Sequence, residues 1–122
     1  LAPVPRRERV TLPRIPRGVK LTSLDAIADP GAVVCYLDNN AAVIITRRAG
    51  AIAAFHNVCP HAGYPLQRAD GRILVQEGSY MVCGGHGASF ALDTGACAGG
   101  PCNGEGLTRV AIVVRDGAVF TA

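Results

Sequence analysis

Apolar positions along the chain fall into short runs that are separated by Gly, Pro, Asn and Asp. The runs are rich in Val and Ile, and none keeps a helical period long enough for a stable helix, which is the pattern of β-strands joined by turns. The predicted strands are Val19–Thr22, Ala32–Leu37, Ala41–Thr46, Ala51–Phe55, Ile73–Gln76, Ser79–Val82, Ser89–Leu92, Thr108–Arg115 and Ala118–Thr121. We find no internal repeat, and the sequence predicts an all-β fold.

Turn residues indicate how neighbouring strands pair. Asp38-Asn39-Asn40 and Asp116-Gly117 each separate two β-branched runs, which is typical of hairpins. Ala49-Gly50 and Pro30-Gly31 are further turn signals. Ser23 is placed to cap one helical turn over Leu24–Ile27.

Composition limits the size and class of the protein. The 122 residues suffice for one domain, and 49% hydrophobic against 17% charged residues favours a packed globule over a disordered chain. No apolar run approaches the roughly 20 residues of a membrane-spanning helix. The chain starts with Leu, so the sequence leaves open an initiator, a signal peptide or a further domain upstream.

Positive charge is concentrated at the N-terminal end. Residues 1–20 hold six basic residues and one acidic residue, whereas the rest holds six basic and eight acidic residues. Four prolines in the same stretch oppose helix formation. We therefore predict an extended basic arm over residues 1–18 and a domain over residues 19–122. The arm has no interleaved aromatic residues to stack on bases, so we expect a solvated or partner-packed tail and no nucleic-acid partner.

Two short loops carry the chemistry-bearing residues, Cys59-Pro60-His61-Ala62-Gly63 and Cys83-Gly84-Gly85-His86-Gly87. Each combines one thiol and one imidazole, and 21 residues lie between His61 and Cys83, enough for a small hairpin. Thiolates suit iron and sulfide, and imidazole is a neutral borderline ligand. A structural zinc site pairs Cys with Cys and His with His at short spacing, so the mixed loops disfavour zinc. Buried residues without a metal are disfavoured because Gly/Pro-rich loops leave such groups half exposed.

The paired Cys-x-His and Cys-x-x-His loops resemble the Rieske [2Fe-2S] signature. The resemblance runs from about Val19 to the C-terminus and includes Gly63, Pro65-Leu66, Gly87, Phe90, Asp93-Thr94-Gly95 and Gly100-Pro101. It implies an antiparallel β-sandwich base with a small inserted cluster-binding subdomain, here about residues 55–101.

The resemblance also implies the ligand set. Cys59 and Cys83 would bind one iron and His61 and His86 the other, and a loop at Gly99-Gly100-Pro101 would shield the cluster from water. Two ferric ions, two sulfides and two thiolates with neutral imidazoles have no net charge, so the reduced cluster carries one negative charge. This is less than in an all-thiolate cluster and raises the potential.

Four positions depart from the high-potential branch of the family. Tyr64 and Gly85 stand where that branch has a disulfide between the loops, and Ala88 and Phe90 stand where it has hydroxyls bonded to the cluster sulfurs. Fewer hydrogen bonds stabilise the reduced state less, so we expect a potential on the order of −150 mV to zero.

The remaining cysteines and His56 carry weaker signals. Cys35 lies in an apolar strand and is interpreted as a buried small residue. Cys97 and Cys102 are close enough in sequence to pair, but a reducing cytosol favours thiols. His56 is interpreted as a structural residue at the edge of the first loop. With His61 and His86 assigned to the cluster, His56 is the one histidine left, which is too few for a second iron site with two His and a carboxylate.

The resemblance therefore implies a one-electron carrier and no enzyme. As a Rieske-type ferredoxin it would take electrons from a flavoprotein reductase and deliver them to a terminal oxygenase in the cytoplasm. The alternative is a Rieske module or subunit of a larger redox enzyme. The odd number of cysteines, five, disfavours a disulfide framework.

Overall fold

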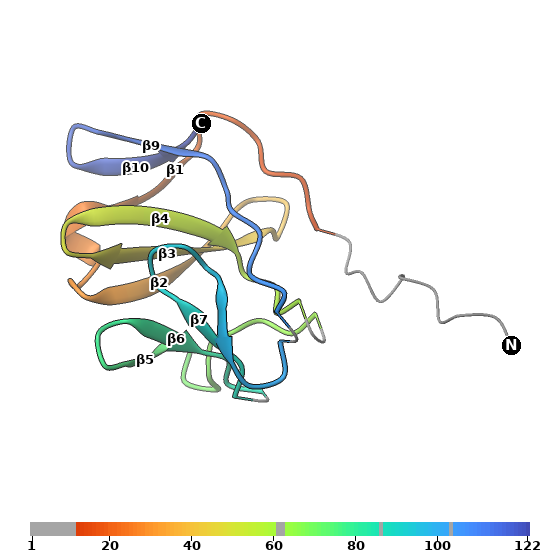
Figure 1. Cartoon of the computed structure of the whole chain (residues 1–122). Coiled ribbons are helices and arrows are strands. Elements are labelled where there is room, and N and C mark those ends of the chain that lie inside the picture. The colour runs from red at the N-terminus through yellow and green to blue at the C-terminus, as the bar shows by residue number, and fades with distance from the viewer. Residues whose placement is uncertain (1–11, 61–62, 86, 103) are drawn as a thin grey trace, which may run out of the picture.

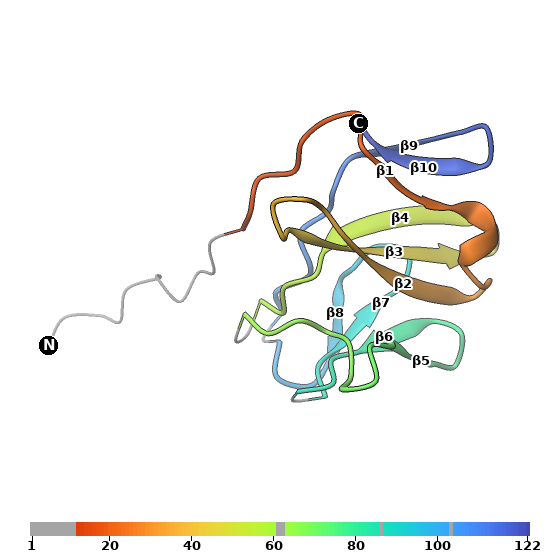
Figure 2. The same cartoon turned by 180° about the vertical axis from the view of Figure 1, so that it is seen from behind.

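The computed structural model describes residues 12–60, 63–85, 87–102 and 104–122, and within them the chain forms three antiparallel sheets. The sheets have the strand orders β1-β10-β9, β2-β3-β4 and β5-β6-β7-β8. Their bounds are β1 Lys20–Ser23, β2 Gly31–Tyr36, β3 Ala42–Arg48, β4 Ala51–His56, β5 Leu74–Gln76, β6 Tyr80–Val82, β7 Ser89–Ala91, β8 Cys97–Gly99, β9 Ile112–Arg115 and β10 Ala118–Thr121, with one 3₁₀ turn, Leu24–Ala26. Figures 1 and 2 show the sheet β2-β3-β4 between the other two.

The central sheet is buried on both faces, which explains its nearly continuous apolar sequence. Side chains alternate along a strand, so Val43 and Ile45 of β3 point to one face and Ile44 to the other. Val43 and Ile45 pack in a core with Val119 of β10, whereas Ile44 packs in a second core with Phe90 of β7. The central sheet thus separates two hydrophobic cores.

The third sheet, β5-β6-β7-β8, is formed by the chain between β4 and β9 and lies at the opposite side of the central sheet from the two termini of the domain (Figure 1). Two strands lead directly into the cysteine loops, because β4 ends at His56 shortly before Cys59 and β6 ends at Val82 immediately before Cys83. The fold therefore brings both loops to the core that the third sheet shares with the central one.

The prediction of an all-β fold is confirmed, and all nine predicted strands are present, one with the predicted bounds, Ala118–Thr121, and the others with shifted ends. Three details were wrong. The strand expected over Thr108–Arg115 begins only at Ile112, and Ser23 makes no side-chain hydrogen bond to cap the turn that follows it. The strand β8 was not predicted at all.

The described part of the N-terminal arm, residues 12–18, has no strand or helix but is attached to the domain. The Thr121 hydroxyl donates a hydrogen bond to the carbonyl oxygen of Pro16 at 2.7 Å and accepts one from the amide of Val19 at 2.8 Å. Asn39 donates its amide to the carbonyl oxygen of Arg14 at 3.0 Å. Residues 1–11 of the predicted arm lie outside the described residues. In the part of the chain that the structure describes, no helix has the length and apolar character needed to cross a membrane.

Candidate metal centre

The first cysteine loop is a turn closed by the backbone of Cys59. Its amide donates to the carbonyl oxygen of Tyr64 at 2.8 Å, and its own carbonyl accepts from the amide of Gly63 at 2.7 Å. Gly63 has φ of +80°, a conformation that side-chain-bearing residues rarely adopt. The turn therefore holds Cys59 at its start, and the Cys59 side chain is almost fully buried.

The second loop repeats this arrangement. The amide of Cys83 donates to the carbonyl oxygen of Ala88 at 2.7 Å, and the amide of Gly87 donates to the carbonyl oxygen of Cys83 at 3.1 Å. The partners are again five and four residues after the cysteine, and the glycine in the fourth position again has a positive φ, +78°. The described ends of the two turns are thus joined by equivalent hydrogen bonds, with a cysteine at the same place in each.

The two turns lie against each other. The amide of Gly84 donates to the carbonyl oxygen of Leu66 at 3.0 Å, and the amide of Leu66 donates to the side-chain oxygen of buried Asn57 at 2.8 Å. A Cβ at Gly84 would lie 3.2 Å from the Cα of Arg68. A Cβ at Gly85 would lie 3.9 Å from the sulfur of Cys83 and from the ring of Tyr64. Glycine at position 84 therefore lets the backbones of the two segments approach closely, whereas position 85 has only ordinary contacts with side chains.

Cys59 and Cys83 belong to one hydrophobic core and neither forms a disulfide. They are 1% and 2% exposed, and buried Ala88 and Phe90 belong to the same core. Thiols on paired turns in an apolar, water-poor environment fit the thiolate side of a mixed Cys/His iron–sulfur site. His61 and His86 lie outside the described residues, and among the described ones no three His, Cys, Asp or Glu side chains gather in a metal-binding group.

A third segment, residues 97–102, covers the second turn. A Cβ at Gly100 would lie 2.8 Å from the carbonyl oxygen of Gly87 and 3.0 Å from the Cα of Ala88, so this glycine is in backbone-to-backbone contact with the turn. Cys97 and Cys102 form a disulfide, with their Cα atoms 6.0 Å apart. The expectation that both remain thiols was wrong, because β8 brings the two residues together. The disulfide lies beside the loop predicted to shield the cluster.

His56 and Cys35 lie on the other face of the central sheet. Both pair in register with Val43, which points into the core shared with β10, so neither side chain faces the core that contains Cys59 and Cys83. Burial lowers the pKa of His56, and its Nδ1 has no hydrogen-bond partner among the described residues. Burial raises the pKa of the Cys35 thiol.

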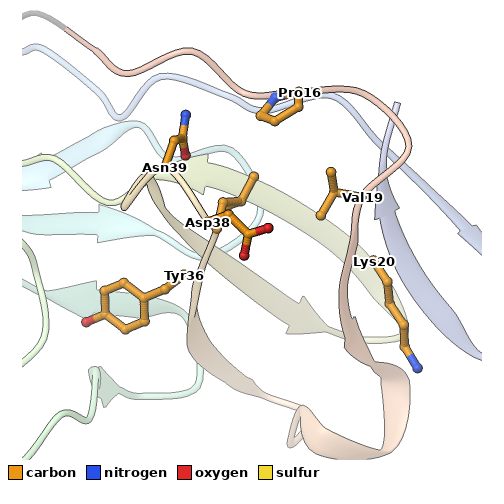
Figure 3. Close-up of a pocket in the computed structure, with 7 residues that line it drawn as sticks. Pro16, Val19, Lys20, Tyr36, Asp38 and Asn39 are labelled. Atoms are coloured by element: carbon orange, nitrogen blue, oxygen red, sulfur yellow. The ribbon is translucent and has the colours of Figure 1, made fainter.

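A shallow pocket of about 260 Å³ lies between the arm and the turn after β2 (Figure 3). Its lining is Pro16, Val19, Lys20, Tyr36, Leu37, Asp38 and Asn39. None of these residues belongs to the two cysteine turns, so the pocket is separate from the candidate metal centre.

Three antiparallel sheets with two cysteine turns of matched hydrogen bonding place the chain among the small all-β proteins. A sequence model described as the Rieske [2Fe-2S] domain matches residues 19–115. The chain therefore belongs to the Rieske [2Fe-2S] domain family and carries one Rieske-type [2Fe-2S] cluster.

Solved structures with the same fold include complete ferredoxins. A ferredoxin of Sphingomonas yanoikuyae B1 is 26% identical, with a TM-score of 0.69 over 85% of this chain and 96% of its own. The ferredoxin of carbazole 1,9a-dioxygenase from Nocardioides aromaticivorans IC177 is 22% identical, with a TM-score of 0.68 over 88% of this chain and 98% of its own. The terminal oxygenase of the same system is 20% identical, with a TM-score of 0.67 over 86% of this chain but only 29% of its own. Direct sequence comparison with curated proteins gives no match.

Proposed function

We propose that the chain is a Rieske-type ferredoxin that carries single electrons from a flavoprotein reductase to a terminal oxygenase. The observation that supports this most is the pair of equivalent turns, which present the buried thiols of Cys59 and Cys83 in one apolar core. The ferredoxins of similar fold match this chain over nearly their whole length, which favours a stand-alone carrier.

In this proposal Cys59 and Cys83 bind one iron, and His61 and His86 bind the other. The bound cluster supplies reversible one-electron chemistry near the expected potential, on the order of −150 mV to zero. The protein residues fix the ligands and limit the access of water. The turns hold both cysteines by backbone hydrogen bonds. The buried side chains of Ala88 and Phe90, in the same core, contain no polar atom. Substrate oxidation is assigned to the partner, since the third histidine, His56, faces the other core.

The remaining assignments belong to the same proposal. Residues 1–18 form an arm outside the electron-carrying domain, residues 19–122, whose cluster-binding subdomain spans about residues 55–101. The carrier works in the cytoplasm with redox proteins and no nucleic acid. Tyr64 is 55% exposed in the first turn and gives a partner an aromatic surface next to the proposed site.

A second candidate function is a Rieske module or subunit of a larger redox enzyme. The oxygenases of similar fold favour it, because this chain matches about a third of their length at most. Mass spectrometry of the natural full-length protein separates the two functions. A mass near 12.6 kDa supports the carrier, and a much larger chain supports the module.

Visible and EPR spectra of the purified and dithionite-reduced protein test the proposed function. We expect a coloured protein with two irons per chain and a reduced signal whose average g lies below that of an all-cysteine ferredoxin. His86→Cys is expected to lower the potential or prevent assembly, because a thiolate adds negative charge to the cluster. The control His56→Gln should keep the spectrum. Protein that stays colourless and iron-free after anaerobic reconstitution would refute the proposal, and a fully loaded, unchanged cluster in His86→Cys would refute the ligand assignment.

A further inference from the structure

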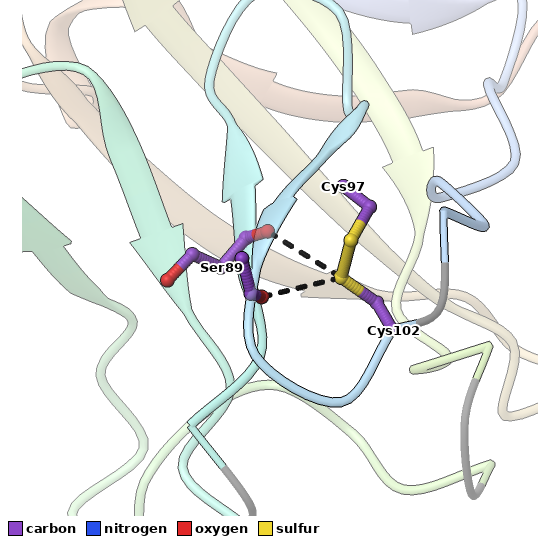
Figure 4. The surroundings of a disulfide bond; sticks show 4 residues. Ser89, Cys97 and Cys102 are labelled. Atoms are coloured by element: carbon purple, nitrogen blue, oxygen red, sulfur yellow. Dashed lines mark hydrogen bonds between the residues drawn. A yellow bond between two sulfur atoms is a disulfide. The ribbon is translucent and has the colours of Figure 1, made fainter.

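The segment that carries the disulfide has few backbone contacts with its own sheet. β8 has three residues, lies at the edge of its sheet, and pairs with β7 only through Ser89–Gly99 and Phe90–Cys97, with an irregularity between them. Short edge strands of this kind open easily. The disulfide joins Cys97 in β8 to Cys102 across the intervening loop, so it closes residues 97–102 into a small ring (Figure 4).

The ring lies directly on the second cysteine turn. The Cβ position of Gly100 is 2.8 Å from the carbonyl oxygen of Gly87 and 3.0 Å from the Cα of Ala88. The carbonyl oxygen of Ala88 accepts the hydrogen bond from the amide of Cys83. Ala88 therefore connects the ring to the backbone hydrogen bond of Cys83, a proposed iron ligand.

The two sulfurs differ in their surroundings. Cys102 is 1% exposed and belongs to the same core as Cys59 and Cys83, whereas Cys97 is half-buried at the margin of that core. The sulfur of Cys102 lies 3.3 Å from the carbonyl oxygen of Gly99 and 3.9 Å from that of Ser89 (Figure 4). A disulfide sulfur has no proton, so these are contacts in the closed ring. When the disulfide opens, the Cys102 thiol donates a hydrogen bond to one of these carbonyl oxygens, so the reduced side chain also has a defined partner.

We propose that the Cys97–Cys102 disulfide is a positioning element for the cluster, and that opening it raises the cluster's reduction potential. The closed bond holds Gly100 against Gly87 and Ala88, and Ala88 is fully buried beneath this contact. With the bond open, water reaches Ala88 and the hydrogen bond that its carbonyl oxygen accepts from Cys83. The oxidised cluster is neutral and the reduced cluster carries one negative charge, so water stabilises the reduced state. The direction of this shift rests on the proposed function, but the contact of the ring with the turn does not.

The bond opens by thiol–disulfide exchange with a dithiol. One thiolate of the dithiol attacks the sulfur of Cys97, the more accessible one, and forms a mixed disulfide while Cys102 leaves as a thiolate and takes a proton. The second thiolate of the dithiol then displaces Cys97. The protein gains two electrons and two protons, and the dithiol becomes a disulfide. In a reducing compartment a disulfide is commonly redox-active, so dithiol proteins are the class of reductant that would act here.

The experiment compares holoprotein with the bond closed, holoprotein treated with dithiothreitol and then freed of it anaerobically, and the double variant Cys97→Ser/Cys102→Ser. The midpoint potential is measured by optical titration with mediators, and amide hydrogen exchange of residues 83–88 and 97–102 is measured by mass spectrometry. Cys35→Ser is the matched control, because it removes a thiol on the other face of the central sheet. Alkylation without reductant first confirms that Cys97 and Cys102 are blocked.

We expect the treated protein and the double variant to show a higher potential and exchange on the order of ten-fold faster in both segments. Cys35→Ser should show neither change, and dithiothreitol should have no effect on the double variant. Four results overturn the proposal: alkylation of Cys97 and Cys102 before reduction, faster exchange confined to residues 97–102, an unchanged potential, or a lowered one. A protein without a cluster would refute the proposed function alone, since hydrogen exchange still tests the contact between ring and turn.

Discussion

The turn between β7 and β8 packs against the ring of Phe55, and the substitution Gly95→Ala tests how far that contact supports the metal centre. Gly95 has φ of +73°, and an added Cβ would lie 2.6 Å from Cε1, 2.8 Å from Cδ1 and 3.2 Å from Cζ of Phe55. Phe55 is fully buried, lies four residues before Cys59, and packs in the core that contains both proposed thiolate ligands. Arg109 covers the ring, with its guanidinium carbon 5.3 Å from the centroid. The ring therefore has little room to move away.

Two costs add in this variant. Alanine in the left-handed region costs about 1 kcal/mol relative to glycine. Forcing a methyl group into a packed core costs about 1–3 kcal/mol more. The expected loss is about 2–4 kcal/mol, a large part of the roughly 5–15 kcal/mol that stabilises a domain.

The chain offers a matched control. Gly117, in the turn between β9 and β10, has the same φ of +73°, and its Cβ position has no neighbour within 4 Å. Gly117→Ala therefore measures the backbone cost alone, about 1 kcal/mol. The difference between the two variants isolates the contact with Phe55.

Urea unfolding followed by circular dichroism gives the free energy of unfolding for both variants and the wild type, and iron content is measured on the same samples. We expect Gly95→Ala to lose at least 1 kcal/mol more than Gly117→Ala and to bind less iron, because displacement of Phe55 disturbs the core around Cys59. Equal losses in free energy of unfolding for the two variants would show that the Phe55 ring moves aside without an energetic penalty, and the reasoning would fail.

Two further predictions concern buried polar groups. Burial lowers the pKa of His56 from about 6.5, so the unfolded chain binds the proton more readily and the free energy of unfolding should fall as the pH drops below about 6.5. Urea midpoints of the wild type and of His56→Gln between about pH 5 and 8 measure this effect. A wild-type midpoint that rises relative to that of the variant as the pH falls would contradict it. Asn57→Ala leaves the amide of Leu66 without its acceptor and should cost about 1–3 kcal/mol, with loss of iron as the segment around the first turn loosens. A variant as stable and as fully loaded as the wild type would show that this hydrogen bond does not hold the first turn in place.

The pattern of residues predicted those strands whose form is set locally. β2, β3 and β4 are β-branched or apolar runs joined by polar or glycine-containing turns, and both signals act within a few residues. β8 has no such signal, because Cys97-Ala98-Gly99 lacks both alternation and β-branched residues. Its form comes from pairing with β7, and a tertiary constraint of this kind is not visible in local propensity.

The same limit explains the disulfide. The sequence placed Cys97 and Cys102 five residues apart, and the expected reducing compartment favoured thiols. Whether two nearby cysteines pair depends on where the backbone directs their Cβ atoms. Here that direction is fixed by the edge strand that the sequence did not reveal.

The metal centre shows which part of a site a motif encodes. The signature differs between the loops, with His two residues after Cys59 and three after Cys83, so the motif alone does not indicate that the two loops share a conformation. The shared signal was the glycine four residues after each cysteine, Gly63 and Gly87, which both have a positive φ and donate to the cysteine carbonyl. Cysteine and glycine therefore make the described hydrogen bonds of each turn, whereas His61 and His86 lie outside the described residues. For this reason the thiolate half of the proposed site can be argued from hydrogen bonds and burial, whereas the imidazole half depends on the spectroscopic test of His86→Cys.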